Sequence, residues 1–244
     1  MKRQERLKIA EEVAEDVLKK YGDIVLAIGV CGSVARGEDT EYSDLDMLAI
    51  VRRKGKKIYD RFFIYKGLPI LVEFWTPEEA KKCIRNMWFK WPIEVGTFLH
   101  VLPLFDPEGV FEGLKKERES LKEEDFKEGA TNALEHIYES FLSVKNAFIN
   151  KRKEIVLLQA RVLAQNVASF LALINRTHFE SGKRVFDKEF KERPEDYDEL
   201  IRVVAGLVSL DHEEVYRASE KLFKVIVSFA KRKGTSIDDS RIRV

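Results

Sequence analysis

The feature that most constrains the fold is a pair of apolar runs separated by a short stretch that contains glycine. Residues 24–31 form the first run and residues 46–51 the second. Runs of this length that are rich in Val, Ile and Leu are typical of buried strands. The stretch between them begins with Gly32 and Ser33 and has a second glycine at Gly37. We therefore expect two buried strands, joined by a connection in which glycine permits tight backbone turns.

This connection carries residue types that suit phosphate chemistry. Gly32 lets a phosphate approach the backbone, where the N–H groups of a following helical turn can donate to it. Asp44 and Asp46 are two residues apart at the head of the second strand, so their side chains leave the same face. Paired carboxylates suit Mg²⁺ when its other ligands are water and phosphate oxygens. Together these features predict phosphoryl or nucleotidyl transfer.

Residues 32–46 resemble the signature of the DNA polymerase β-like nucleotidyltransferase superfamily: Gly-Ser, a further glycine, then Asp-x-Asp on a strand. The alternative is that Asp44 and Asp46 are a solvated strand start and Gly37 an ordinary loop glycine. Three elements in the right order favour the resemblance. It implies that Gly32 and Ser33 hold a nucleoside triphosphate and that the two aspartates bind two Mg²⁺ ions.

Two more residues of this stretch are candidates for nucleotide binding. Arg36 can pair with a phosphate oxygen, or instead with Glu38 or Asp39, and we favour the phosphate. Ser43 directly precedes the two aspartates.

The third metal ligand is expected on a neighbouring strand. Residues 68–75 are apolar except for one carboxylate, Glu73. A buried carboxylate is unfavourable unless a cation or hydrogen-bond donors meet it. The alternative is an edge strand with Glu73 in solvent. The superfamily has its third acidic residue on such a strand, so the resemblance implies that Glu73 helps to bind the ion that activates the acceptor.

Composition limits the possible partners. The chain has 244 residues, of which 43 are basic and 42 acidic, giving a net charge of +1. A protein that grips long nucleic acids usually has a basic excess, so a polymerase or tailing enzyme is disfavoured. The sequence shows no run of about 18 apolar residues and no signal-peptide pattern at its start, so we expect a cytoplasmic protein outside the membrane. Many Lys, Glu and Arg with few Cys, Met and Pro are typical of a thermophile.

The two halves of the chain differ in pattern. Strands are predicted at 24–31, 46–51, 59–65, 68–75 and 99–105, with helices at 8–18, 77–87 and 107–116. Only helical patterns follow, at 126–150, 155–175, 194–210 and 212–233. We expect an α+β fold with a mixed β-sheet and flanking helices at residues 1–120, followed by a helical bundle at residues 121–244.

Further motifs resemble the kanamycin nucleotidyltransferase family. Residues 91–106 contain its Trp-Pro, glycine and Leu-Pro positions, and residues 236–242 resemble its C-terminus. The resemblance covers most of the chain and is weaker over residues 150–235. It implies a homodimer in which the helical domain of one chain helps to close the acceptor site of the other. It also implies a catalytic base on the first long helix of the second domain, at Glu139, with Glu135 and Glu128 as competing candidates.

The chain departs from this family at two positions. A lysine one helical turn after the base is replaced by Ser143, with Lys145 close by, and a lysine two residues before the third acidic residue is replaced by Leu71. In the family both positions contact nucleotide phosphates. These changes weaken the case for aminoglycosides as acceptors more than the case for nucleotidyl transfer.

The residues of the site predict a Mg²⁺-dependent enzyme that transfers a nucleoside monophosphate to a hydroxyl and releases pyrophosphate, and the resemblance implies AMP from ATP as the donated group and a small, aminoglycoside-like molecule as the acceptor. The alternative is an antitoxin-type nucleotidyltransferase that adenylylates a partner protein. Such proteins are usually short, so a fused helical domain weighs against it. A degenerate binding module is disfavoured because all three acidic positions are filled.

Overall fold

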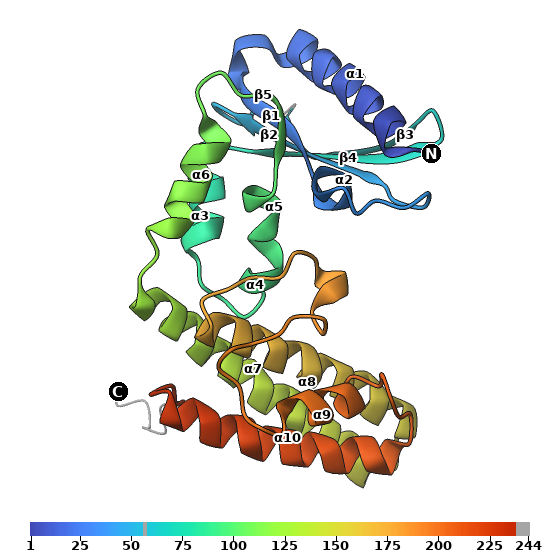
Figure 1. The fold of residues 1–244 in the computed structure, drawn as a ribbon, viewed down its shortest axis with the longest axis vertical. Coiled ribbons are helices and arrows are strands. Elements are labelled where there is room, and N and C mark those ends of the chain that lie inside the picture. The colour runs from blue at the N-terminus through green and yellow to red at the C-terminus, as the bar shows by residue number, and fades with distance from the viewer. Residues whose placement is uncertain (56–57, 238–244) are drawn as a thin grey trace. The chain divides into compact units, whose positions relative to one another are not determined.

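The structure is a computed structural model that describes residues 1–55 and 58–237. The chain forms two compact units (Figure 1). Among the described residues, the first contains residues 1–55, 58–86 and 95–121, and the second contains residues 87–94 and 122–237. Residues 87–94, which the predicted boundary at residue 120 assigns to the first domain, therefore group with the helical unit. Of the predicted C-terminal match at residues 236–242, the part from residue 238 lies outside the described residues.

The first unit is built on a mixed sheet of five strands in the order β3-β4-β2-β1-β5. β2 and β4 are parallel, and the other neighbouring pairs are antiparallel. This sheet, with flanking helices and a following helical unit, confirms the predicted α+β class. The strands are β1 (Val25–Cys31), β2 (Leu45–Val51), β3 (Arg61–Tyr65), β4 (Leu68–Trp75) and β5 (Leu102–Phe105).

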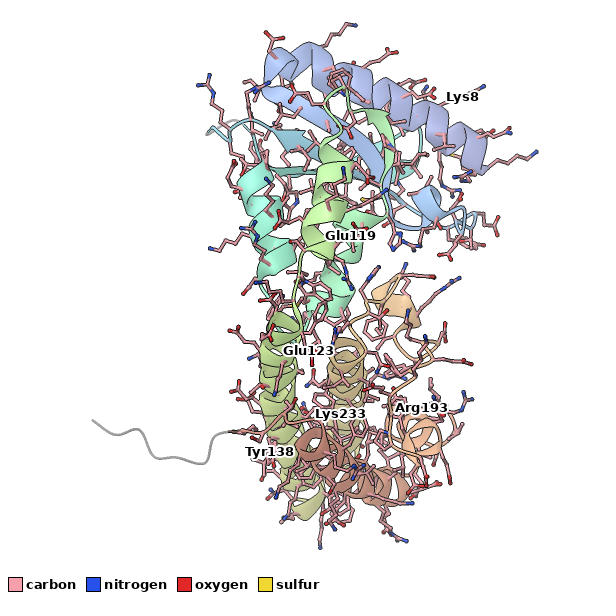
Figure 2. The ribbon with its side chains drawn as sticks, turned by 60° about the vertical axis from the view of Figure 1, so that its left-hand side comes forward. Lys8, Glu119, Glu123, Tyr138, Arg193 and Lys233 are labelled. Carbon is pink, nitrogen blue, oxygen red and sulfur yellow. The ribbon has the colours of Figure 1, made fainter. Side chains whose placement is uncertain are left out.

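One face of the sheet is covered by α1 (Arg3–Tyr21). Its apolar stripe packs on the strands, while charged side chains such as Lys8 lie on the outside (Figure 2). The stripe predicted over residues 8–18 is thus part of a longer helix, which ends before Gly22 as expected. The core between helix and sheet includes Ile9, Ala10, Val13, Ala14, Val17, Ile28, Val30, Met47, Ala49, Ile70, Val72 and Phe74.

Short helices lie on the other side of the sheet from α1 (Figure 1). They are α3 (Pro77–Arg85), α5 (Gly96–Leu99) and α6 (Val110–Glu119). The strand predicted over residues 99–105 was wrong in its first part, because residues 96–99 form α5 and β5 begins only at Leu102. Phe98 and Leu99 are buried as a strand would require, but a short apolar run does not distinguish a strand from a buried helical turn.

The second unit is helical. It contains α4 (Trp91–Glu94), α7 (Glu123–Ile149), α8 (Lys153–Ile174), the short 3₁₀ turn η2 (Gly182–Arg184), α9 (Tyr197–Val204) and α10 (His212–Arg232). The helix predicted over residues 194–210 is therefore shorter than expected. Among the described residues, α8 alone is long and apolar enough to cross a membrane by length and composition. It packs against α7, α9 and α10 as the central helix of this unit, which accounts for its apolar character.

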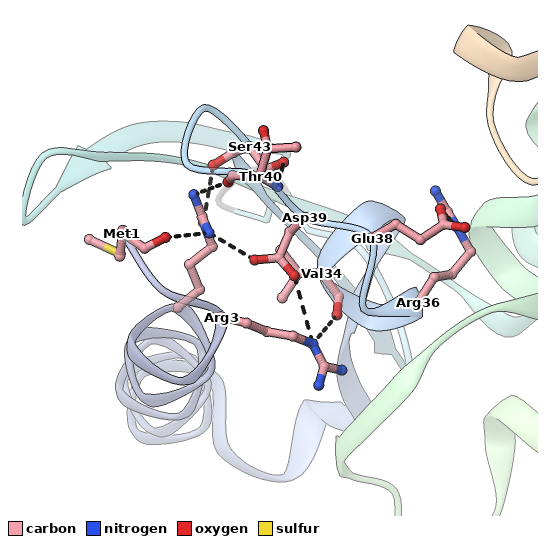
Figure 3. A network of polar contacts seen from close by, with 9 residues as sticks. Met1, Arg3, Val34, Arg36, Glu38, Asp39, Thr40 and Ser43 are labelled. Atoms are coloured by element: carbon pink, nitrogen blue, oxygen red, sulfur yellow. Dashed lines mark hydrogen bonds and ion pairs between the residues drawn. The ribbon is translucent and has the colours of Figure 1, made fainter.

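A buried arginine, Arg6, ties α1 to the loop that leads into β2; its partners Met1, Asp39, Thr40 and Ser43 are labelled in Figure 3. Arg6 is 1% exposed, and its guanidinium donates to the carbonyl oxygens of Met1, Thr40 and Ser43 at 2.9, 2.6 and 3.1 Å. It also pairs with the Asp39 carboxylate at 2.8 Å, whose side chain is 3% exposed. The loop between α2 (Gly32–Arg36) and β2 is therefore fixed at several points to the first helix.

We expect Arg6→Met to lower the free energy of unfolding by about 3–5 kcal/mol, because it removes the buried cation that pairs with the buried Asp39 carboxylate at 2.8 Å. Urea unfolding measures this loss. Arg3→Met is the matched control: Arg3 also faces Asp39, at 3.7 Å, but its side chain is 44% exposed. A loss from Arg6→Met no larger than that from Arg3→Met would show that the buried pair does not stabilise the loop.

Candidate active site

The turn after β1 forms one wall of the candidate site. α2 (Gly32–Arg36) starts directly where β1 ends, and Gly32 has a φ of +68°. A Cβ atom at this position would lie 2.7 Å from Oδ2 of Asp46. Both the backbone angle and this close approach require glycine. Gly32 therefore brings the turn that carries Ser33 directly against the Asp46 carboxylate.

Asp46 and Glu73 project from the same face of the sheet. In the parallel pairing of β2 with β4, Leu48 lies opposite Glu73, and alternation places Asp46 on the face that Leu48 and Glu73 share. The residues that pack under α1 are on the opposite face. Asp44 comes one residue before β2 and is exposed, whereas Asp46 and Glu73 are half-buried.

Electrostatics confirm that acidic groups gather here. Burial raises the pKa of Glu73, and the nearby carboxylates of Asp60 and Asp46 raise it further, while Lys54 acts in the opposite direction. Burial also raises the pKa of the Cys31 thiol, with smaller contributions from the charges of Asp46 and Glu73. Cys31 lies opposite Asp46 in the antiparallel pairing of β1 with β2. A cation bound between these carboxylates would relieve their repulsion.

The donor set fits Mg²⁺ in chemistry. Asp46 and Glu73 offer hard carboxylate oxygens from adjacent strands, and the missing side chain at Gly32 leaves the turn close enough for a ligand to contact both. Asp44 lies at the entrance to β2. Across residues 1–55 and 58–237, no three His, Cys, Asp or Glu side chains stand close enough together to hold a metal by themselves. Water and nucleotide oxygens would have to complete the coordination.

The other two loop candidates make contacts within the protein. The Arg36 Nε donates to Glu38 at 2.9 Å, which is one of the alternatives that the sequence allowed (Figure 3). The Ser43 hydroxyl accepts the backbone N–H of Thr40 at 2.9 Å. Binding of a phosphate by Arg36 would require exchange of its carboxylate partner, whereas the Ser43 hydroxyl can still donate.

Glu139 lies in the middle of α7, in the second unit. Its side chain is 75% exposed, and its carboxylate lies 3.2 Å from Nδ1 of His136. The competing candidate Glu135 accepts a hydrogen bond from Asn132 at 3.1 Å. Ser143, which replaces the family's lysine, donates to the Glu139 carbonyl oxygen at 3.0 Å. The Glu139 carboxylate is therefore largely exposed to solvent, with the imidazole of His136 beside it.

Sequence reasoning missed three groups around Glu73. Asp60 accepts the backbone N–H of Phe74 at 2.9 Å, which places its carboxylate beside β4. The Lys54 ammonium pairs with Glu79 at 2.8 Å, and its positive charge opposes the rise in the pKa of Glu73. Cys31 is a buried free thiol at the end of β1, directly before Gly32. Asp60 and Lys54 carried no comparable signal, because each belongs to a loop.

Family models match both halves of the chain. The nucleotidyltransferase domain model matches residues 10–92, and the KNTase C-terminal domain model matches residues 108–236. The first match contains the turn at Gly32 and all three predicted acidic ligands. The second contains α7 with Glu139.

Individual proteins show the same relationship. The chain is 25% identical over 244 residues to aminoglycoside nucleotidyltransferase (4') from Staphylococcus aureus and from Bacillus sp, covering 99% of this chain and 96% of each relative. A putative protein adenylyltransferase of Methanocaldococcus jannaschii is 38% identical over 78 residues, covering 27% of this chain and 53% of that protein. The crystal structure of a nucleotidyltransferase-like protein from Exiguobacterium sibiricum has the same fold, with a TM-score of 0.55 at 14% identity over 91% of this chain and 77% of the other.

Proposed function

Since this chain belongs to the nucleotidyltransferases that carry a KNTase C-terminal domain, we propose that it transfers AMP from ATP to a hydroxyl group of a small molecule. Membership of this family confirms the predicted resemblance and the enzyme class. The small-molecule acceptor is proposed because relatives aligned over nearly the whole chain are aminoglycoside nucleotidyltransferases. The departures at Leu71 and Ser143 lead us to propose a hydroxylated acceptor of that kind without restricting it to aminoglycosides.

In this reaction an acceptor oxygen attacks the α-phosphorus, the bond to pyrophosphate breaks, and the hydroxyl proton must leave. Mg²⁺, held by Asp44, Asp46 and Glu73, would neutralise the triphosphate and the charge that develops on the attacking oxygen. Ser33 donates to a phosphate oxygen at the turn after β1. Glu139 is the proposed acceptor of the hydroxyl proton.

One observation carries the proposal: the turn at Gly32 stands directly against Asp46, on the face of the sheet that also carries Glu73. A turn that leaves room for a phosphate, next to carboxylates from two adjacent strands, suits a metal-bound triphosphate.

The direct test is incubation of the protein with Mg²⁺, α-labelled ATP and a panel of aminoglycosides and other hydroxylated metabolites. We expect a labelled small-molecule product with pyrophosphate released in equal amount. The Asp46→Asn variant is the control for contaminating enzymes. Absence of labelled product across nucleotides and acceptors, in protein that binds ATP, would argue against small-molecule transfer.

A second candidate is adenylylation of a partner protein, which is favoured by the local match to a putative protein adenylyltransferase. The same labelling experiment in a cell extract distinguishes the two functions. Label that moves to a protein band and to no small molecule would support the alternative.

Ser33→Ala should weaken ATP binding by about 1–3 kcal/mol, because a hydrogen bond to a charged acceptor is lost. Calorimetric titration with ATP and Mg²⁺ measures the effect. Ser120→Ala is a suitable control, because Ser120 lies at the end of α6 and its hydroxyl donates to the Glu117 carbonyl oxygen. Equal ATP affinity of the two variants would show that the turn at Gly32 does not hold the nucleotide.

We also propose a homodimer. The likeness to kanamycin nucleotidyltransferase motivates it, and exposed apolar side chains on α7 and on α8 support it. Tyr138, Leu142 and Ile149 lie along one side of α7, at exposures of 36%, 60% and 66%, with Tyr138 on the outside of the helix (Figure 2). Leu158 and Val162 on α8 are 62% and 42% exposed. A face of this kind marks an interaction surface.

Light scattering at micromolar concentration should give twice the chain mass of 28.4 kDa. The double variant Leu142→Glu, Leu158→Lys should give the monomer mass, because it places charges in the interface. Phe62→Lys, at a 69% exposed position on β3, should leave the dimer intact. A monomeric wild-type protein would refute the proposal.

A further inference from the structure

A buried indole N–H without a partner lies on the strand that carries Glu73. Among the described residues, the buried side-chain nitrogen and oxygen atoms that lack a hydrogen-bond partner are Nε of Arg61, Nε1 of Trp75 and Oγ1 of Thr235. A buried donor that stays unpaired destabilises the folded state and calls for an explanation. Only Trp75 shares a strand with a proposed metal ligand.

The indole ring is held rigidly in place. Its edge-to-face contact with Phe98 has a centroid distance of 5.1 Å and an interplanar angle of 89°, and Phe98 is 2% exposed. The Lys54 ammonium lies 5.4 Å from the centroid of the indole ring and pairs with Glu79 at 2.8 Å. The indole therefore cannot easily turn toward a different acceptor.

The Glu73 carboxylate is an acceptor on the same strand. Trp75 follows Glu73 by two residues on β4, so both side chains leave the same face of the sheet. The two side chains are therefore neighbours on β4, although the indole N–H forms no hydrogen bond in the metal-free protein.

We propose that Trp75 is a positioning residue whose indole N–H donates to one oxygen of Glu73 when the other oxygen turns toward the metal ion. This inference rests on the proposed function, because it takes Glu73 as a ligand. In the metal-free protein the N–H remains unpaired. The unpaired N–H destabilises the metal-free protein, and metal binding removes this penalty because the N–H then has an acceptor. The hydrogen bond fixes the orientation of the Glu73 carboxylate, as outer-shell partners do for ligating side chains.

The proposal predicts two effects for Trp75→Phe, which keeps an aromatic ring and removes the N–H and part of the ring. In the metal-free protein, relief of the unpaired N–H should offset the lost ring contacts with Phe98 and Lys54, so that the protein unfolds at about the same temperature as wild type. Its affinity for Mg²⁺ should fall by about 10–100-fold, the usual loss when an outer-shell partner is removed. A purely structural role of the indole would lower the unfolding temperature instead.

The direct readout is the indole N–H resonance in ¹⁵N-labelled protein, in which the three tryptophans give separate signals. The signal absent from Trp75→Phe is assigned to Trp75. Addition of magnesium chloride should move it downfield, and Glu73→Gln should abolish the shift. The Trp88 signal is the internal control, because its N–H already donates to Glu94 at 3.0 Å and should stay in place.

The outcomes separate this inference from the function on which it rests. If Glu73→Gln weakens Mg²⁺ binding while Trp75→Phe binds like wild type and the Trp75 signal does not move, the inference is wrong and the metal assignment stands. If Glu73→Gln binds Mg²⁺ like wild type, Glu73 is not a ligand and both fail. A shift at Trp75 together with weaker binding in Trp75→Phe would support the proposal.

Discussion

Replacement of Asp46 by Asn should abolish nucleotidyl transfer and leave the fold intact. Loss of a metal-binding carboxylate removes several kcal/mol of transition-state stabilisation, which corresponds to a fall in turnover of roughly 10³-fold or more. The metal-free protein should be as stable as wild type or more so, because Asp46 and Glu73 no longer repel each other. We expect the same pattern for Asp44→Asn.

Turnover with labelled ATP and urea unfolding measure the two parts of this prediction. Asp60→Asn is the matched control. The Asp60 carboxylate also helps to raise the pKa of Glu73, but it accepts the Phe74 N–H and has no proposed role with the metal. Undiminished turnover in Asp46→Asn, or an equal loss in Asp60→Asn, would remove the assignment of Asp46 as a metal ligand.

Glu139→Gln should lower turnover by about 10²–10⁴-fold, the usual contribution of a positioned general base. Binding of ATP and Mg²⁺ should persist, because Glu139 lies in a different compact unit from the turn at Gly32. Glu135→Gln is the control, one helical turn earlier on α7. If Glu135→Gln gives the large loss, the aligned position is wrong by one turn, and if neither variant loses activity, the base lies elsewhere.

The pH–rate profile adds a second readout, provided that Glu73 is taken into account. Its pKa is raised, so this carboxylate takes up a proton as the pH falls through that raised value, and Mg²⁺ binding weakens. Saturating Mg²⁺ competes with the proton and moves this effect to lower pH. At saturating Mg²⁺, the fall in turnover at low pH should therefore remain in the wild-type profile and be absent from that of Glu139→Gln.

The elements that set the site were predictable because their signals are local. The apolar runs on either side of Gly32 gave β1 and β2 nearly to the residue, and the single carboxylate in residues 68–75 indicated which strand faces the site. The pairing of Leu48 with Glu73 was not predictable. Strand order depends on which distant segments meet, and the periodicity of one strand carries no such information.

The contacts that hold the loop were also missed. Arg6 occupies the apolar stripe of α1, three residues before Ile9, and a charged residue at such a position is a signal that it meets a buried partner. The sequence alone does not say that the partner is Asp39, because the loop that carries it has no regular pattern. Neither the unpaired N–H of Trp75 nor the contact of its ring with Phe98 is recorded in the period of one strand.

The division of the chain has a consequence for exchange of parts between related proteins. The chain passes from one compact unit to the other three times, after residues 86, 94 and 121. A chimera joined at residue 121 alone would replace α7 but keep the recipient's Trp91, whose ring packs edge-to-face on Phe126 at 5.5 Å. A graft of the helical unit should therefore also carry residues 87–94, and recombination in this family should favour crossovers that move both segments together.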